Sequence, residues 1–165
     1  MARYLMAKKY LEEGTFALAA DIFLALGGYS DSQKLYNEAR YQTAEDYMAK
    51  GDYSMAYSVY TQLGDYLDSA KKAETAKLAK LWNGDWTWYS ARSHGSTTGG
   101  VVRSIDIVSK TISNFAGGQS ALITEISSTE LTYYLSTGRS YTVTLASDSR
   151  ATVSDGEKVI FILNK

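Results

Sequence analysis

The spacing of apolar residues changes once along the chain, near position 83. Up to residue 82, apolar residues recur every three or four positions, as in amphipathic helices. From residue 85 onward they alternate with Ser, Thr and other polar residues, as in half-buried strands. Asn83-Gly84-Asp85 lies at the change and supplies residue types that end helices and form turns. We therefore predict an α+β fold, with a helical domain over residues 1–83 and an antiparallel β domain over residues 84–165.

The helical part contains an internal repeat. Residues 10–37 align with residues 47–74 at an offset of 37, and the identities fall on residue types that set backbone geometry and packing. The identical pairs include Tyr10/Tyr47, Gly14/Gly51, Ala19/Ala56, Leu26/Leu63, Gly27/Gly64, Tyr29/Tyr66 and Asp31/Asp68.

Each repeat has the pattern of two helices joined by a tight turn. Gly14 and Gly51 lie where the first helix of each repeat has to stop, which predicts a reversal there. Asp31-Ser32 and Asp68-Ser69 fall where the next helical pattern begins, and we predict that their side chains cap its N-terminus. Residues 67–82 form a fifth predicted helix, so the expectation is two helical hairpins and a closing helix.

The segment Leu63-Gly64-Asp65-Tyr66-Leu67-Asp68-Ser69 and its degraded copy at residues 26–32 are similar to the connector of bacterial tetratricopeptide repeats. The small and aromatic positions of both repeats fit that family, although the period is 37 rather than 34 and the usual proline is absent. The resemblance covers residues 2–82. It implies a concave surface, built from the first helix of each repeat, that binds a protein or peptide.

The resemblance also implies which side chains line that surface. Glu38 and Glu45 favour a basic partner or no partner, and a second copy of the chain or the β domain is a further candidate occupant of so short a groove. The alternative for each position is a side chain that packs between helices or is simply solvated. The implied partner-binding residues are Tyr4, Lys8, Glu38, Tyr41, Glu45 and Met48.

The β domain shows about seven short alternating segments. Trp86 and Trp88 fall on one face of the first segment, and hairpin turns are predicted at Thr137-Gly138 and Asp155-Gly156. Hairpin-linked strands with one apolar face predict a small antiparallel barrel or a strongly curled sheet.

The opening Gly84-Asp85-Trp86 resembles the start of lipocalin-like barrels. That resemblance implies an alternative function, in which the barrel binds a small apolar ligand and the helices serve as a spacer or dimerisation element. The alternative role of the interior aromatic residues is to fill the barrel core. The implied ligand-binding residues are Trp86, Trp88, Tyr133 and Tyr141.

Composition argues against catalytic chemistry. The chain has no Cys and one His, and His94 lies in a polar, Gly-rich loop. We therefore expect no enzyme activity, no catalytic residues, no metal site and no cofactor. The formal charge is −1, and residues 84–165 carry seven basic and seven acidic residues. Because this half has no excess of positive charge, we do not expect it to bind nucleic acid by stacking bases on aromatic residues beside Arg92, Arg103 and Arg139.

The most apolar segment, residues 16–26, is interrupted by Asp21 and is too short to cross a bilayer. Its predicted place is in a buried helix. The N-terminal residues have the pattern of an amphipathic helix rather than of a leader peptide. These features predict no direct membrane insertion and leave the cellular compartment open.

Overall fold

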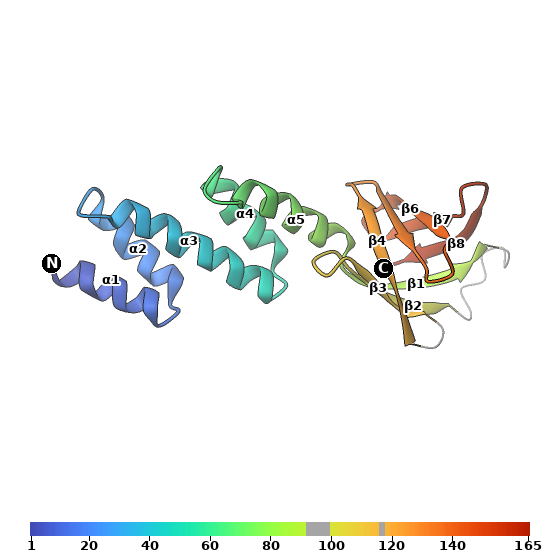
Figure 1. Cartoon of the computed structure of the whole chain (residues 1–165), viewed down its shortest axis with the longest axis horizontal. Helices are drawn as coiled ribbons and strands as arrows, with labels where there is room; N and C mark the ends of the chain where they lie inside the picture. The colour runs from blue at the N-terminus through green and yellow to red at the C-terminus, as the bar shows by residue number, and fades with distance from the viewer. Residues whose placement is uncertain (92–99, 116–117) are drawn as a thin grey trace. The chain divides into compact units, whose positions relative to one another are not determined.

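Five helices occupy the N-terminal half of the chain, as the sequence predicts (Figure 1). In this computed structural model, which describes residues 1–91, 100–115 and 118–165, the first four helices form two hairpins and a fifth follows. Their bounds are α1 Ala2–Glu12, α2 Phe16–Leu26, α3 Ser32–Ala49, α4 Tyr53–Leu63 and α5 Ser69–Trp82.

The two connectors between hairpins have nearly identical backbones, so the sequence repeat is also a structural repeat. Gly27 has a φ of 57° and Gly64 a φ of 58°, and both are paired with a ψ near −120°. That region is open essentially to glycine alone, which explains why glycine stands at both positions. Three residues later, Ser30 and Leu67 have φ values of 53° and 52°.

The helical hairpins pack around two separate apolar clusters. The first centres on Phe23, with Ala7 and Ala19 at the places where helices approach closely. The second centres on Tyr60, with Ala44 and Ala56 in the corresponding places. Because a methyl side chain lets two backbones come close, these alanines allow the large rings to fill the space beside them.

Within the described residues, eight strands follow the helices and form a closed antiparallel barrel in sequence order, with β1 hydrogen-bonded to both β2 and β8. The predicted barrel is thereby confirmed over the curled sheet. The strands are β1 Gly84–Ser90, β2 Val101–Asp106, β3 Thr111–Phe115, β4 Gln119–Ile126, β5 Glu130–Tyr134, β6 Ser140–Ser147, β7 Arg150–Ser154 and β8 Val159–Asn164.

The expected number of strands, about seven, was one too few. The missing strand is β3, which is short and contains an irregularity between Ile112 and Phe115. Asn114 has a φ of 67° there, so the regular alternation of side chains breaks within five residues. The predicted turns at Gly138 and Gly156 are present, with φ values of 80° and 94°.

The chain divides into two compact units, Met1–Lys77 and Leu78–Lys165. We call them the helical unit and the barrel unit. The last turn of α5 therefore belongs to the barrel unit, although the composition changes at Asn83-Gly84-Asp85.

Candidate functional site

Each repeat contains a hydrogen bond from a tyrosine in its first helix to the aspartate of the following connector. Tyr4 donates to Asp31 Oδ1, and Tyr41 donates to Asp68 Oδ1 at 2.5 Å. These bonds favour the ionised carboxylate, and they are the largest cause of the lowered pKa of both aspartates. The predicted capping role of Asp31 is wrong, because its side chain makes no capping hydrogen bond to α3. Its carboxylate instead accepts the Tyr4 hydroxyl, 27 residues away in the chain.

Replacing Asp68 by asparagine is expected to make the helical unit less sensitive to acid. The folded pKa of Asp68 lies below the ordinary aspartate value of 3.8, so its contribution to stability is complete above the unfolded pKa. That contribution is lost as the pH falls through the folded pKa. Urea unfolding followed by circular dichroism at 222 nm should therefore show a less stable variant at pH 7 and a difference in stability that shrinks as the pH falls below the ordinary aspartate pKa of 3.8. The exposed neighbour Asp65 provides the control, since an Asp65→Asn variant that reproduced this pattern would contradict the assignment.

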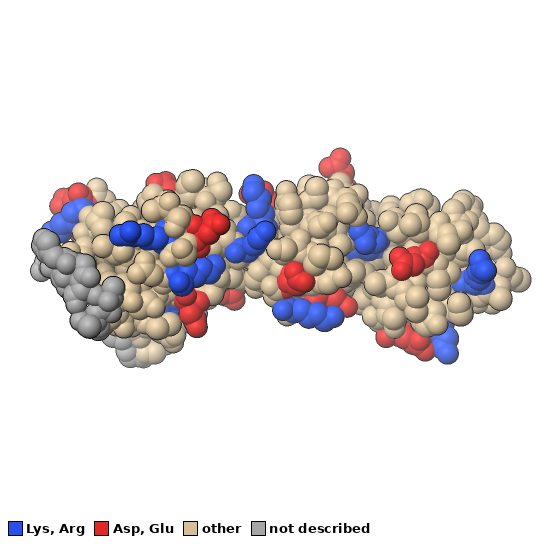
Figure 2. Space-filling view, turned by 180° about the vertical axis from the view of Figure 1, so that it is seen from behind, with Lys and Arg blue, Asp and Glu red and all other residues tan. Residues whose placement is uncertain are grey.

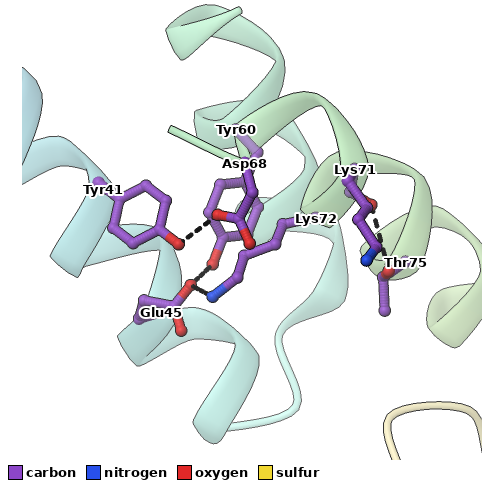
Figure 3. A network of polar contacts seen from close by, with 7 residues as sticks. All are labelled: Tyr41, Glu45, Tyr60, Asp68, Lys71, Lys72 and Thr75. Carbon is purple, nitrogen blue, oxygen red and sulfur yellow. Dashed lines mark hydrogen bonds and ion pairs between the residues drawn. The ribbon is translucent and has the colours of Figure 1, made fainter. Parts of the chain in front are cut away.

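A polar network lies beside the second of these bonds (Figure 3). Glu45 Oε1 accepts from the Tyr60 hydroxyl and from Lys72 Nζ. Burial and the Glu45 carboxylate raise the pKa of Tyr60. Burial alone would lower the pKa of Lys72, but its bonds to Glu45 and Tyr41 outweigh burial and raise it. The Lys72 nitrogen also lies 5.1 Å from the centre of the Tyr41 ring.

The first repeat has a different set of residues at the corresponding positions. At the offset of 37, Lys8, Phe23 and Leu35 take the places of Glu45, Tyr60 and Lys72. Phe23 and Leu35 belong to the first apolar cluster, so the polar network is a property of the second repeat.

The structure brings together the residues that the resemblance assigned to the second repeat. Glu38, Tyr41 and Glu45 follow one face of α3, and burial together with Glu38 raises the pKa of Tyr66, whose ring lies 6.1 Å from that of Tyr41. Met48, half-buried, packs against the second apolar cluster.

In the first repeat, Lys8 is exposed and its nitrogen lies 5.9 Å from the centre of the Tyr4 ring. Tyr4 itself contacts the Phe23 and Tyr29 rings edge-on.

On the face of the molecule in Figure 2, basic and acidic side chains are interspersed.

Two buried indoles, Trp82 at the end of α5 and Trp86 on β1, lie against each other, with 6.3 Å between their ring centres and 40° between their planes. Trp86 is fully buried and donates from Nε1 to the carbonyl oxygen of Trp82 at 2.9 Å. Trp82, also fully buried, donates from Nε1 to the carbonyl oxygen of Ser127 at 2.8 Å. Lys165 donates to the carbonyl oxygen of Leu81 and lies over the Trp86 ring, with 5.4 Å from its nitrogen to the ring centre. These contacts hold the end of α5 in the mouth of the barrel.

A second aromatic group fills the interior around Trp88. The Trp88 ring contacts Phe115, Tyr133 and Phe161 edge-on at 5.8–6.2 Å. Tyr133 in turn stacks on Tyr141, with 5.4 Å between ring centres. Trp88 and Tyr133 are almost completely buried, whereas Tyr141 is half-buried.

Sequence reasoning did not identify the most unusual residue of this group, Arg103. Its guanidinium carbon lies 4.5 Å from the centre of the Trp88 ring, 4.6 Å from that of Phe115 and 5.7 Å from that of Phe161. Burial lowers its pKa from the usual value. The signal was present in the alternation, because Arg103 falls between Val101 and Ile105 on the inward face of β2.

An open depression of about 580 Å³ adjoins this aromatic group. Two of its lining residues, Tyr141 and Phe161, also belong to the contacts around Trp88 and Tyr133. The other residues that line it are Ser90, Ala91, Lys158, Val159 and Ile160.

Several expectations concern residues or features elsewhere. His94 and Arg92 lie outside the residues that the structure describes. Among residues 1–91, 100–115 and 118–165, no helix has the length and apolar character of a membrane span, and no three carboxylate or imidazole groups gather as metal ligands. Comparisons with protein-family models, with curated proteins and with solved structures found no match for this chain.

Proposed function

We propose that the chain is a non-catalytic binding protein and that its helical unit binds a protein or peptide partner through the side of α1, α3 and α5 that carries the tyrosine–aspartate bonds. Two helical hairpins of one repeated design support this proposal, because stacked hairpins present the first helix of each repeat along a common surface. The proposed contact residues are Tyr4, Lys8, Glu38, Tyr41, Glu45 and Met48.

The observation that carries the proposal is the network around Glu45. Glu45 Oε1 accepts two hydrogen bonds within the helical unit, while Figure 3 shows the second carboxylate oxygen pointing away from Tyr60 and Lys72. The carboxylate is thus held in place and has an oxygen available to a donor on a partner. Glu38 and Asp68 lie in the same region. With Glu45 they make three acidic groups there against two basic ones, Lys71 and Lys72. Both features favour a partner segment that carries Lys or Arg.

Selection from a phage library of random twelve-residue peptides tests this proposal, and the selected peptides are then measured by fluorescence anisotropy. We expect enrichment of peptides with Lys or Arg, and at least tenfold weaker binding to a Glu38→Lys variant. Asp21→Lys, an exposed change on α2, is the matched control and should leave binding unchanged. Selected peptides without basic residues, or equal binding to both variants, would refute the proposal.

The barrel interior supports a structural role for the aromatic residues named as an alternative ligand site. Trp86, Trp88 and Tyr133 are buried against other side chains of the barrel unit. Because these rings fill the interior, no specific contact supports the alternative in which they line a site for a small apolar ligand. The proposed function therefore does not include that alternative.

A further inference from the structure

Arg103 is a cation placed inside the barrel. It lies opposite Trp86 in the β1–β2 register, on the face of β2 that also carries the buried Ile105. Its guanidinium group is surrounded by the rings of Trp88, Phe115 and Phe161. An arginine in such a place is unusual, because a side chain of the same length without charge would pack against these rings at no cost in desolvation.

The guanidinium has donors without acceptors. Arg103 Nε and Nη1 are buried, and neither has a hydrogen-bond partner among the described residues. None of the ion pairs in that part of the chain includes Arg103. Aromatic rings attract the flat face of a guanidinium, but they do not satisfy N–H groups that point along its edge.

A second unsatisfied donor lies beside the first. Trp88 Nε1 is also buried without an acceptor among the described residues, and the Trp88 ring is the one closest to the guanidinium. Two carboxylates of the barrel unit are engaged elsewhere: Asp85 accepts from Ser104, and Asp155 accepts from the backbone at the β7–β8 turn. Among the described residues, the Arg103 cation and the Trp88 N–H group thus both lack an acceptor, whereas Lys165, the cation over the Trp86 ring, donates to the Leu81 carbonyl oxygen.

We propose that the barrel unit binds an organic monocarboxylate, with its carboxylate on Arg103 and Trp88 Nε1 and its apolar part in the depression beside Phe161 and Tyr141. The two oxygens of a carboxylate match the two sets of unsatisfied donors, and its negative charge matches the Arg103 cation. Val159, Ile160 and Phe161 supply apolar walls for the remainder of the molecule. This site is separate from the proposed peptide-binding surface and does not depend on it.

Octanoate and octanamide provide matched probes, since they share the same chain and differ in charge. Titration of the full chain is followed by tryptophan fluorescence and by the indole N–H resonances in NMR spectra. We expect octanoate to bind at least tenfold more tightly than octanamide and to shift the Trp88 indole N–H resonance. Equal binding of the two probes, or no binding of octanoate, would overturn the proposal. Sodium sulfate that produced the same shift at the same concentration would overturn the assignment to a carboxylate.

Arg103→Met separates ligand binding from a structural role. The variant should lose the preference for octanoate, whereas the control Arg139→Met, a change of an exposed arginine on the same unit, should retain it. Without ligand, Arg103→Met should melt at a higher temperature than the unchanged protein, because an unpaired buried charge has been removed. A lower melting temperature would show that the guanidinium serves the packing of the rings. If the variant does not fold, the comparison of octanoate with octanamide on the unchanged chain still decides the matter.

Discussion

Replacing Trp86 by alanine is expected to lower the free energy of unfolding of the barrel unit by about 3–5 kcal/mol, the usual cost of removing a large buried ring. Trp86 is fully buried, its ring packs on Trp82, and its Nε1 donates to the Trp82 carbonyl. The variant therefore loses apolar contacts and leaves a buried carbonyl without its donor. For a unit of this size, such a loss is a large share of the total stability.

Tryptophan fluorescence measures this effect in one unit of the chain. All three tryptophans, at positions 82, 86 and 88, lie within Leu78–Lys165, so two indoles still report on the barrel in the variant. Tyr134→Ala is the control, because Tyr134 lies on β5 with 46% of its surface exposed. A Trp86→Ala loss no larger than that of Tyr134→Ala would mean that the indoles do not hold the barrel together.

The second large effect is expected in the helical unit, where Tyr60→Ala should cost about 3–5 kcal/mol. Tyr60 is fully buried at the centre of the second apolar cluster, and its hydroxyl donates to Glu45. Tyr60→Phe keeps the ring and removes that donor, so it should cost about 1–2 kcal/mol. The difference between the two variants separates the contribution of packing from that of the hydrogen bond.

Denaturant unfolding at 222 nm measures both variants, since that signal is dominated by the helices. Tyr57→Ala provides a matched control from the same helix, with a side chain that is 40% exposed. We expect this control to change stability by less than about 0.5 kcal/mol. If Tyr60→Phe proved as damaging as Tyr60→Ala, the hydrogen bond to Glu45 rather than the ring would dominate.

The helical part could be predicted from sequence because its signals are local and occur twice. Glycines at equivalent positions and a helical apolar period specify the same turn and the same hairpin in both repeats. The partner of Asp31 could not be found in this way. A local motif predicts an N-terminal cap, but the Tyr4 hydroxyl reaches the carboxylate from 27 residues away and replaces that role.

The sequence predicted an antiparallel barrel but neither its strand β3 nor the inward position of Arg103, for two physical reasons. The bulge in β3 breaks a five-residue alternation, so no pattern remains for a sequence argument to detect. Arg103 was not among the predicted site residues, and charged residues usually face solvent. Its position between Val101 and Ile105 places it inward, and this shows that alternation can outweigh residue type in locating a side chain.

Closure of the barrel also bears on how this chain can associate with others. Open sheets present a row of unpaired main-chain N–H and C=O groups, on which a strand of another molecule can be added. Here the pairing of β1 with β8, from Thr87↔Asn164 to Ser90↔Phe161, joins what would otherwise be the two outermost strands. Leu122 and Val159 are exposed apolar residues on the strands. Because the sheet is closed, neither residue lies on a strand with an unpaired edge to which another chain could add. Strand-by-strand growth into fibres first requires the β1–β8 seam to open.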